Sequence, residues 1–248
     1  MKKLLILPLL GLLACQPDNP QPNTTNNGSG SGNTSDTTST GGGTGNISPC
    51  LDIPTEVVDV TNPTTGKTWM DRNLGASQAA TSSTDTLAYG DLYQWGRGAD
   101  GHQCRTSPTT ATLSSTDQPG HGDFILSPNS PYDWRSPQND NLWQGVNGVN
   151  NPCPSGYRLP TYAELNAERS SWGSNDETGA FASPLKLPLA GFREGSLGSL
   201  FYVGTYVYYW SSTVSGAHAY GLALGSSFAG MNSICLRADG YSVRCLKD

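Results

Sequence analysis

The sequence predicts an α+β domain that is rich in loops, with short twisted antiparallel sheets and two helices. Short runs of β-type residues recur along it, and segments of Gly, Pro, Asn and Ser separate them. One segment carries a clear signal for the start of a helix. Charged residues make up only 14% of the chain, whereas Gly alone accounts for 30 residues. This composition suits a loop-rich extracellular domain.

Seven short β-type runs are predicted to form strands. They cover residues 56–60, 67–74, 91–96, 185–192, 206–214, 218–224 and 241–246. The run at 91–96 also fits a helix, and a second helix is expected around Gly90 to Trp95, where the strand and helix interpretations compete. Between His102 and Asn150 the sequence predicts one long loop, which compact domains rarely contain.

The clearest helix begins in RLPTYAELNAERSSW. Thr161 followed by Glu164 forms a capping box, in which the threonine oxygen accepts from a backbone amide and the glutamate reaches back to the cap residue. Leu165 and Arg169 continue the helix for one or two more turns. We therefore expect the helix to start at this threonine.

The N-terminus predicts export. Two lysines precede an apolar run from Leu4 to Ala14, which is too short to span a bilayer as a permanent helix. The run ends in LLAC, which resembles the lipobox of bacterial lipoproteins, so that Cys15 would be the lipidated residue. An ordinary secretory signal is the alternative. Gln16 follows, and not the aspartate typical of inner-membrane retention, so the resemblance implies an outer-membrane anchor with display at the cell surface.

Three segments follow from this reading. Residues 1–15 are predicted to be the lipoprotein signal peptide. Residues 16–48 contain Asn, Thr, Ser, Gly and Pro with almost nothing apolar, so they cannot bury a core and are predicted to be a disordered tether. Residues 49–248 are predicted to be a single domain.

Several function classes are disfavoured. The formal net charge is −6 and no basic cluster exists, which argues against nucleic-acid binding. The HExxH, GxSxG, CxxC and P-loop patterns are absent, so we predict no enzyme. His102, Asp117, His121 and Asp123 could in principle bind a metal. Solvated loop histidines are commoner, and the spacing matches no established site, so no metal or other cofactor is expected.

Five motifs carry a resemblance to a known family. They are NPTTGKTWMDRNLGAS (62–77), YGDLYQWGRGADGH (89–102), DWRSPQNDNLWQGVNGVNNPCPSGYRLPTYAEL (133–165), YYWSSTV (208–214) and GYSVRCLKD (240–248). The chain resembles the bacterial surface domains described as a major paralogous family in Fibrobacter. Those domains have a C-type-lectin-like, or formylglycine-generating-enzyme-like, fold. The resemblance implies this fold for residues 49–248. Calcium is possible in that superfamily, but no compact run of carboxylates specifies it here.

Many domains of this kind are the variable proteins of diversity-generating retroelements, in which errors at template adenines rewrite codons near the end of the gene. The segment at about 208–240 resembles their variable, ligand-binding region. Residues 217–236 contain no Lys, Glu, Gln or Trp, which gives this interpretation mild support. The candidate contact residues are His218, Tyr220, Gly221, Ala223, Gly225, Phe228, Asn232, Ser233, Ile234, Cys235, Leu236 and Asp239. Trp210 and Tyr241 are expected to build the scaffold beneath them.

The alternation of side chains in 218–224 predicts which face of this strand is exposed. Leu222 and Leu224 share one face and are expected to be buried. Gly221, Ala223 and Gly225 share the other face, and they are poor strand formers on a side predicted to be exposed. The alternative is a face of small residues that allows close approach of another strand. Both interpretations remain open at this point.

The chain has six cysteines, and lipidation of Cys15 leaves an odd number. The resemblance implies a disulfide between Cys153 and Cys245, because both fall in matched motifs and the terminal strand of the fold lies near the second helix. Cys50 and Cys104 would form a second bridge. Cys235 remains outside both pairs and is interpreted as one of the residues that a mutated adenine-rich codon can encode.

These observations predict a surface-displayed lipoprotein whose lectin-like domain binds a protein or glycan through a C-terminal face diversified by a retroelement. The partner would lie on another cell, a phage or a host surface, and the membrane would be contacted through the lipid anchor. A non-diversified structural or adhesion lipoprotein of the cell envelope, with the same fold, is the alternative. A formylglycine-generating-type oxidase is a third reading, but the other motifs of that enzyme are missing.

Overall fold

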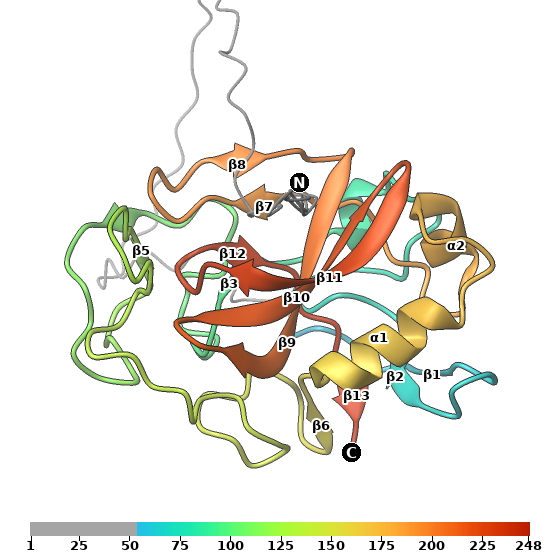
Figure 1. The fold of residues 1–248 in the computed structure, drawn as a ribbon, viewed down its shortest axis with the longest axis horizontal. Helices are drawn as coiled ribbons and strands as arrows, with labels where there is room; N and C mark the ends of the chain where they lie inside the picture. The colour runs from blue at the N-terminus through green and yellow to red at the C-terminus, as the bar shows by residue number, and fades with distance from the viewer. Residues whose placement is uncertain (1–53) are drawn as a thin grey trace, which may run out of the picture. The chain divides into compact units, whose positions relative to one another are not determined.

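The computed structural model describes residues 54–248 of the chain. The predicted signal peptide (1–15), the predicted tether (16–48) and the cysteines Cys15 and Cys50 lie outside these residues. The described part is an α+β domain built from small, mostly antiparallel sheets, two helices and long loops (Figure 1). This agrees with the fold class that the sequence predicts.

The longest strands form a three-stranded antiparallel sheet with the order β11-β10-β9. Its strands are β9 (Tyr206–Ser215), β10 (His218–Gly225) and β11 (Phe228–Cys235). One four-stranded sheet has the order β1-β2-β13-β6, with β1 (Asp59–Thr61), β2 (Thr68–Met70), β13 (Leu246–Lys247) and β6 (Tyr157–Arg158). The other has the order β3-β12-β7-β8, with β3 (Tyr93–Gln94), β12 (Gly240–Tyr241), β7 (Phe192–Arg193) and β8 (Leu200–Phe201). A short parallel pair joins β4 (Thr109–Thr110) and β5 (Phe124–Ile125).

Helix α1 (Tyr162–Ser170) begins where the capping box predicts. The Thr161 side chain accepts from the amide of Glu164 at 3.3 Å, and the Glu164 carboxylate accepts from the amide of Thr161 at 2.9 Å. Helix α2 (Glu177–Ala182) is the second helix, and a single 3-10 turn covers Thr86–Ala88. The expected helix around residues 90–95 is wrong, because the chain there forms β3 and the turns beside it.

The hydrophobic core lies between α1 and one face of the β9–β10–β11 sheet. This inner face contributes Tyr209, Leu222 and Leu224, each fully buried, and α1 contributes Leu165. Helix α1 packs against all three strands, so it crosses the sheet (Figure 1). The prediction that Leu222 and Leu224 are buried is therefore confirmed.

Buried arginines tie the long loops to the sheets. Arg97 donates to the carbonyl oxygens of His121 and Asp123 at 3.1 and 2.9 Å. Arg193 donates to the carbonyl oxygen of Ser107 at 2.7 Å. Buried backbone carbonyls need hydrogen-bond partners, and a guanidinium supplies several donors in a fixed geometry. These contacts explain how a compact domain accommodates the long loop that the sequence predicts.

The disulfide between Cys153 and Cys245 is present, and it links residues 92 positions apart. It joins the loop before β6 to the segment that leads into β13, so it fastens the C-terminus to the domain. Cys104 is buried and disulfide-bonded, whereas its predicted partner Cys50 lies outside the described residues.

The predicted strands 56–60, 67–74 and 91–96 correspond to the shorter strands β1, β2 and β3, and two other predicted strands depart further from the observed ones. In the run 185–192 only Phe192 belongs to a strand, and its buried leucines instead fill the core as an irregular segment. The run 241–246 is divided between β12 and β13, because its two ends pair with different sheets. The segment around Ile234 has no obvious periodicity in sequence, yet it lies in β11.

Candidate functional site

The candidate site is the outer face of the β9–β10–β11 sheet, on the side opposite α1. Tyr206, Tyr208 and Trp210 of β9 lie on this face, and their partners on β10 are Gly225, Ala223 and Gly221 in that order. A row of aromatic residues therefore runs beside a row of small ones. At one end Trp210 stacks on Tyr241 of β12, with ring centroids 4.3 Å apart, and both residues are fully buried. The prediction that these two residues build the scaffold is confirmed.

The small residues are buried, contrary to the interpretation that places them on an exposed face. A Cβ atom on Gly225 would lie 3.0 Å from a ring carbon of Tyr206, because that ring packs over the glycine. A Cβ atom on Gly221 would lie 3.1 Å from the Cys235 sulfur. Ala223 is only 6% exposed. The alternative interpretation, small residues that permit close approach, describes this face.

The aromatic row continues to the surface. Tyr206 lies 5.0 Å from Phe228 and 6.0 Å from Tyr202, measured between ring centroids. Tyr206 and Phe228 are half-buried, while Tyr202 is 39% exposed and its neighbour Val203 is 45% exposed. We call these four residues the aromatic surface. Packing of each ring against the next fixes their positions on the sheet.

Tyr202 adopts an unusual backbone conformation in the turn before β9. Its φ of 55° lies in the left-handed region, which costs roughly 1–2 kcal/mol for a residue other than glycine. Its carbonyl oxygen accepts from the amides of Thr205 and Tyr206, both at 3.0 Å, and these bonds hold the turn. Strained residues of this kind cluster at ligand-contacting sites. The turn thus presents a bulky aromatic side chain to solvent.

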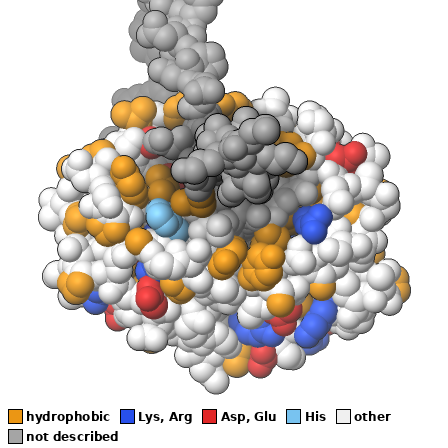
Figure 2. Space-filling view, in the orientation of Figure 1, with side chains coloured by type: hydrophobic (Ala, Val, Ile, Leu, Met, Phe, Trp, Pro, Cys, Tyr) orange, Lys and Arg blue, Asp and Glu red, His pale blue; other side chains and the backbone are white. Residues whose placement is uncertain are grey.

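The absence of charge distinguishes this region from the rest of the sequence. No Lys, Arg, Asp or Glu occurs between Gly195 and Leu236, although charged residues make up 14% of the chain. In Figure 2 the visible face is mostly uncharged, and charged side chains gather mainly along its lower rim. The uncharged run from Gly195 to Leu236 is the sequence signal for Tyr202, Val203 and Tyr206, which are not among the predicted contact residues.

The predicted contact residues divide into two groups. The half-buried ones, whose side chains still reach solvent, are His218, Tyr220, Phe228, Asn232, Ser233, Ile234 and Leu236. Phe228 and Asn232 lie on the outer face, opposite Gly225 and Gly221. Tyr220 instead packs against Tyr162 at the start of α1, with tilted rings whose centroids are 4.7 Å apart, and so lies on the side of the sheet that α1 covers. The predicted set is therefore not one continuous surface.

The other five predicted contact residues are buried, so the prediction that they contact a ligand is wrong. They are Gly221, Ala223, Gly225, Cys235 and Asp239. The Cys235 thiol, which is fully buried, points toward the carbonyl oxygen of Asn232 at 3.9 Å. A side chain in this position cannot reach a ligand, so the interpretation of Cys235 as display surface is wrong. The register between β10 and β11 shifts between Ala219 and Gly221, and Cys235 is paired with Ala219, which is also fully buried.

Asp239 is a structural residue. Its carboxylate accepts from the amide of Gly195 and from the hydroxyl of Tyr241, both at 2.8 Å. Burial raises the pKa of Asp239 from its ordinary value to about 7. Because the folded state binds this proton more tightly than the unfolded chain does, the group favours folding at low pH. That contribution is lost as the pH rises from about 4 to about 7.

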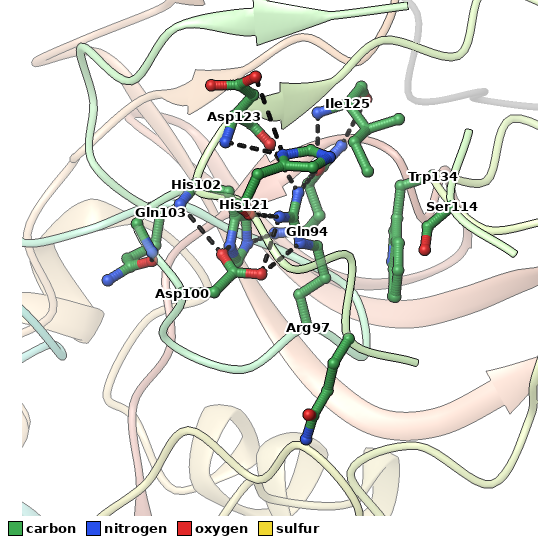
Figure 3. Close-up of polar contacts among 12 residues, drawn as sticks. Gln94, Arg97, Asp100, His102, Gln103, Ser114, His121, Asp123, Ile125 and Trp134 are labelled. Carbon is green, nitrogen blue, oxygen red and sulfur yellow. Dashed lines mark hydrogen bonds and ion pairs between the residues drawn. The ribbon is translucent and has the colours of Figure 1, made fainter. Parts of the chain in front are cut away.

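The loop residues considered for a metal serve structural roles. His102 Nδ1 lies 2.6 Å from Asp100 Oδ1, and its Nε2 accepts from the amide of Gln94 at 3.0 Å (Figure 3). Burial lowers the pKa of His102 to about 4, so the imidazole is neutral and both of its nitrogens are engaged. Asp117 pairs with Arg135 at 2.8 Å. His102 therefore has no position left for a metal.

A polar pocket of about 370 Å³ lies beside this network, and its lining includes Asp100, Asp117 and His121. Within residues 54–248 no group of three or more His, Cys, Asp or Glu side chains is arranged to hold a metal ion. The Asp100 carboxylate is already bound by Arg97 at 2.8 Å and by His102. The described part of the chain also contains no helix with the length and apolar character needed to cross a membrane.

Comparison of the chain with protein-family models, curated proteins and solved structures finds no match.

Proposed function

We propose that the domain is a binding module of the C-type-lectin-like type, without catalytic activity, and that it binds its partner through the aromatic surface. The observation that carries this proposal is the row of rings that leads from the buried Trp210 to the half-buried Tyr206 and Phe228 and to the exposed Tyr202. Exposed apolar groups of this kind mark interaction sites.

The chemistry of the surface favours an uncharged partner. The centres of protein interfaces are depleted in charged residues and enriched in Tyr, Trp and Phe, and this region has that composition. Tyrosine supplies a large contact area with few rotatable bonds, so little conformational entropy is lost on binding. A neutral protein surface or a neutral glycan fits these properties better than an anionic ligand does.

Display and diversification belong to the same proposal. A lipid on Cys15 and a tether over residues 16–48 would present the domain at the outer membrane to partners on other cells, phages or hosts. Diversification would act on outer-face positions that reach solvent, such as Phe228 and Asn232. A nearby reverse-transcriptase gene, with a template repeat that differs only opposite adenines, supports this part, and a genome without such a repeat refutes it.

The binding experiment compares the full chain with variants of the aromatic surface. Wild type is tested on a neutral glycan array and on intact bacterial, phage and host-cell surfaces. Phe228→Ser and Tyr202→Ser are expected to weaken any binding by about tenfold or more, as aromatic hot spots do. Leu87→Ser is the matched control, because Leu87 is 59% exposed and lies outside the uncharged region. Equal binding by all four proteins would refute the assignment of this surface.

A further inference from the structure

Strand β11 is an edge of the three-stranded sheet, and the two edges of that sheet differ. The backbone of β9 is bonded on both sides: the Tyr206 carbonyl oxygen accepts from the amide of Gly191 at 2.8 Å, and that of Tyr208 accepts from Ser242 at 3.1 Å. The backbone amides and carbonyl oxygens of the even-numbered residues of β9 thus point away from β10. Those of the odd-numbered residues, such as Tyr209, point toward β10.

The register extends this alternation across the sheet. Leu222 and Leu224 pair with Tyr209 and Val207, so their backbone groups point toward β9. The backbone groups of Gly221, Ala223 and Gly225 of β10 then point toward β11. Their partners there are Asn232, Gly230 and Phe228. The residues of β11 that remain, Ala229, Met231 and Ser233, therefore direct their amides and carbonyl oxygens outward. Among residues 54–248 no backbone hydrogen bond satisfies these outward groups.

This edge lacks the features that normally prevent strand addition. Natural edge strands are commonly short, or carry Lys, Pro or inward-pointing charges. β11 has eight residues, FAGMNSIC, with no charge and no proline. All of them except Cys235 are half-exposed. Helix α1 contacts β11 from the inner face of the sheet, and a Cβ atom added to Gly230 of this strand would meet no other atom within 4 Å.

Any edge strand can pair in the antiparallel sense with a second copy of itself, and the absence of charge and proline in β11 removes the usual obstacles to that pairing. Ala229 and Ser233 are placed symmetrically about Met231. In an antiparallel arrangement with a two-fold axis beside Met231, each Ala229 faces the Ser233 of the other copy, and the two Met231 residues face each other. We propose that β11 pairs with β11 of a second copy of this chain and joins the two sheets into one. Since β11 carries no charge, the pairing brings no like charges together.

This pairing has a consequence for binding. Residues directly opposite each other in an antiparallel pair lie on the same face of the sheet, so both outer faces point to the same side. The two aromatic surfaces would then engage one partner surface together, which raises avidity without new contacts. The dimer itself does not depend on the proposed function, because it rests only on the edge of the sheet.

The experiment measures the mass of the full chain by light scattering over a wide range of concentrations. Wild type is expected to reach twice the 26.2 kDa mass of one chain. Ser233→Pro removes an outward amide that the fold does not use, and is expected to weaken the dimer at least tenfold. Ser233→Thr keeps that amide and is the matched control, which should dimerise like wild type.

Hydrogen exchange of the wild type tests the same contact without a substitution. The amides of Ala229, Met231 and Ser233 should exchange slowly only at concentrations where the dimer forms. A monomer at all concentrations overturns the proposal, as does a dimer in which these amides exchange fast or which Ser233→Pro leaves intact. Protection that appears only when an unrelated extended peptide is added also overturns it, because the edge would then serve a different partner.

Discussion

Two glycines of the same sheet provide a direct test of how the outer face is packed. Gly221 lies on β10 and Gly230 on the edge strand β11. A Cβ atom on Gly221 would lie 3.1 Å from the Cys235 sulfur and 3.2 Å from the Tyr209 carbonyl oxygen. A Cβ atom on Gly230 would meet no other atom within 4 Å. Neither glycine has a positive φ, so valine fits the backbone at both positions.

The expected effects of Gly221→Val and Gly230→Val on stability have opposite signs. At Gly221 the neighbouring atoms must shift, and overpacking of this kind costs about 1–3 kcal/mol. At Gly230 the added side chain meets open space, and removing a glycine from a strand stabilises by up to about 1 kcal/mol. The two variants should therefore differ by about 1–4 kcal/mol in their free energy of unfolding.

Urea denaturation measures this difference, provided that the slope of the transition is the same for both variants. The reasoning is refuted if both substitutions destabilise equally, or if Gly221→Val is neutral. Neutrality at Gly221 would mean that this position is open to solvent. In that case the interpretation of Gly221 as an exposed, diversified residue would return.

Three further outcomes are expected from the buried polar groups and the disulfide. Burial raises the pKa of Asp239 to about 7, so at pH 8 the folded protein carries a buried charge that Asn lacks. Asp239→Asn should therefore stabilise the protein by up to about 4 kcal/mol at pH 8 and by little at pH 4. Denaturation at several pH values measures this difference. Cys153→Ala with Cys245→Ala should lower the free energy of unfolding by roughly 4–5 kcal/mol, since the bridge closes a loop between residues 92 positions apart. Arg97→Met should cost about 3–5 kcal/mol, because it removes the guanidinium that neutralises the partly buried Asp100 carboxylate and donates to two backbone carbonyls. Thermal unfolding of the variant and the wild type measures this loss.

Local signals in the sequence determined several elements of this protein. The start of α1 follows from Thr161 and Glu164, which interact within one turn and need no distant contact. Strand β9 follows from a long run of β-branched and aromatic residues, and β10 follows from the alternation around its two leucines; the end of each strand differs from the prediction by one residue. The burial of Leu222 and Leu224 follows from alternation, because a strand needs one apolar face against a core.

Tertiary structure decided the rest. The sequence left open whether Gly221, Ala223 and Gly225 face solvent, since small residues fit an exposed face and a close approach equally well. The answer came from neighbouring strands: the Tyr206 ring packs over Gly225, and the Cys235 sulfur lies beside Gly221. In the same way, only the order of the strands shows that β11 is an edge with Ala229, Met231 and Ser233 pointing outward. Burial of the second face of a strand and the pairing of an edge depend on contacts between distant segments, which no local pattern encodes.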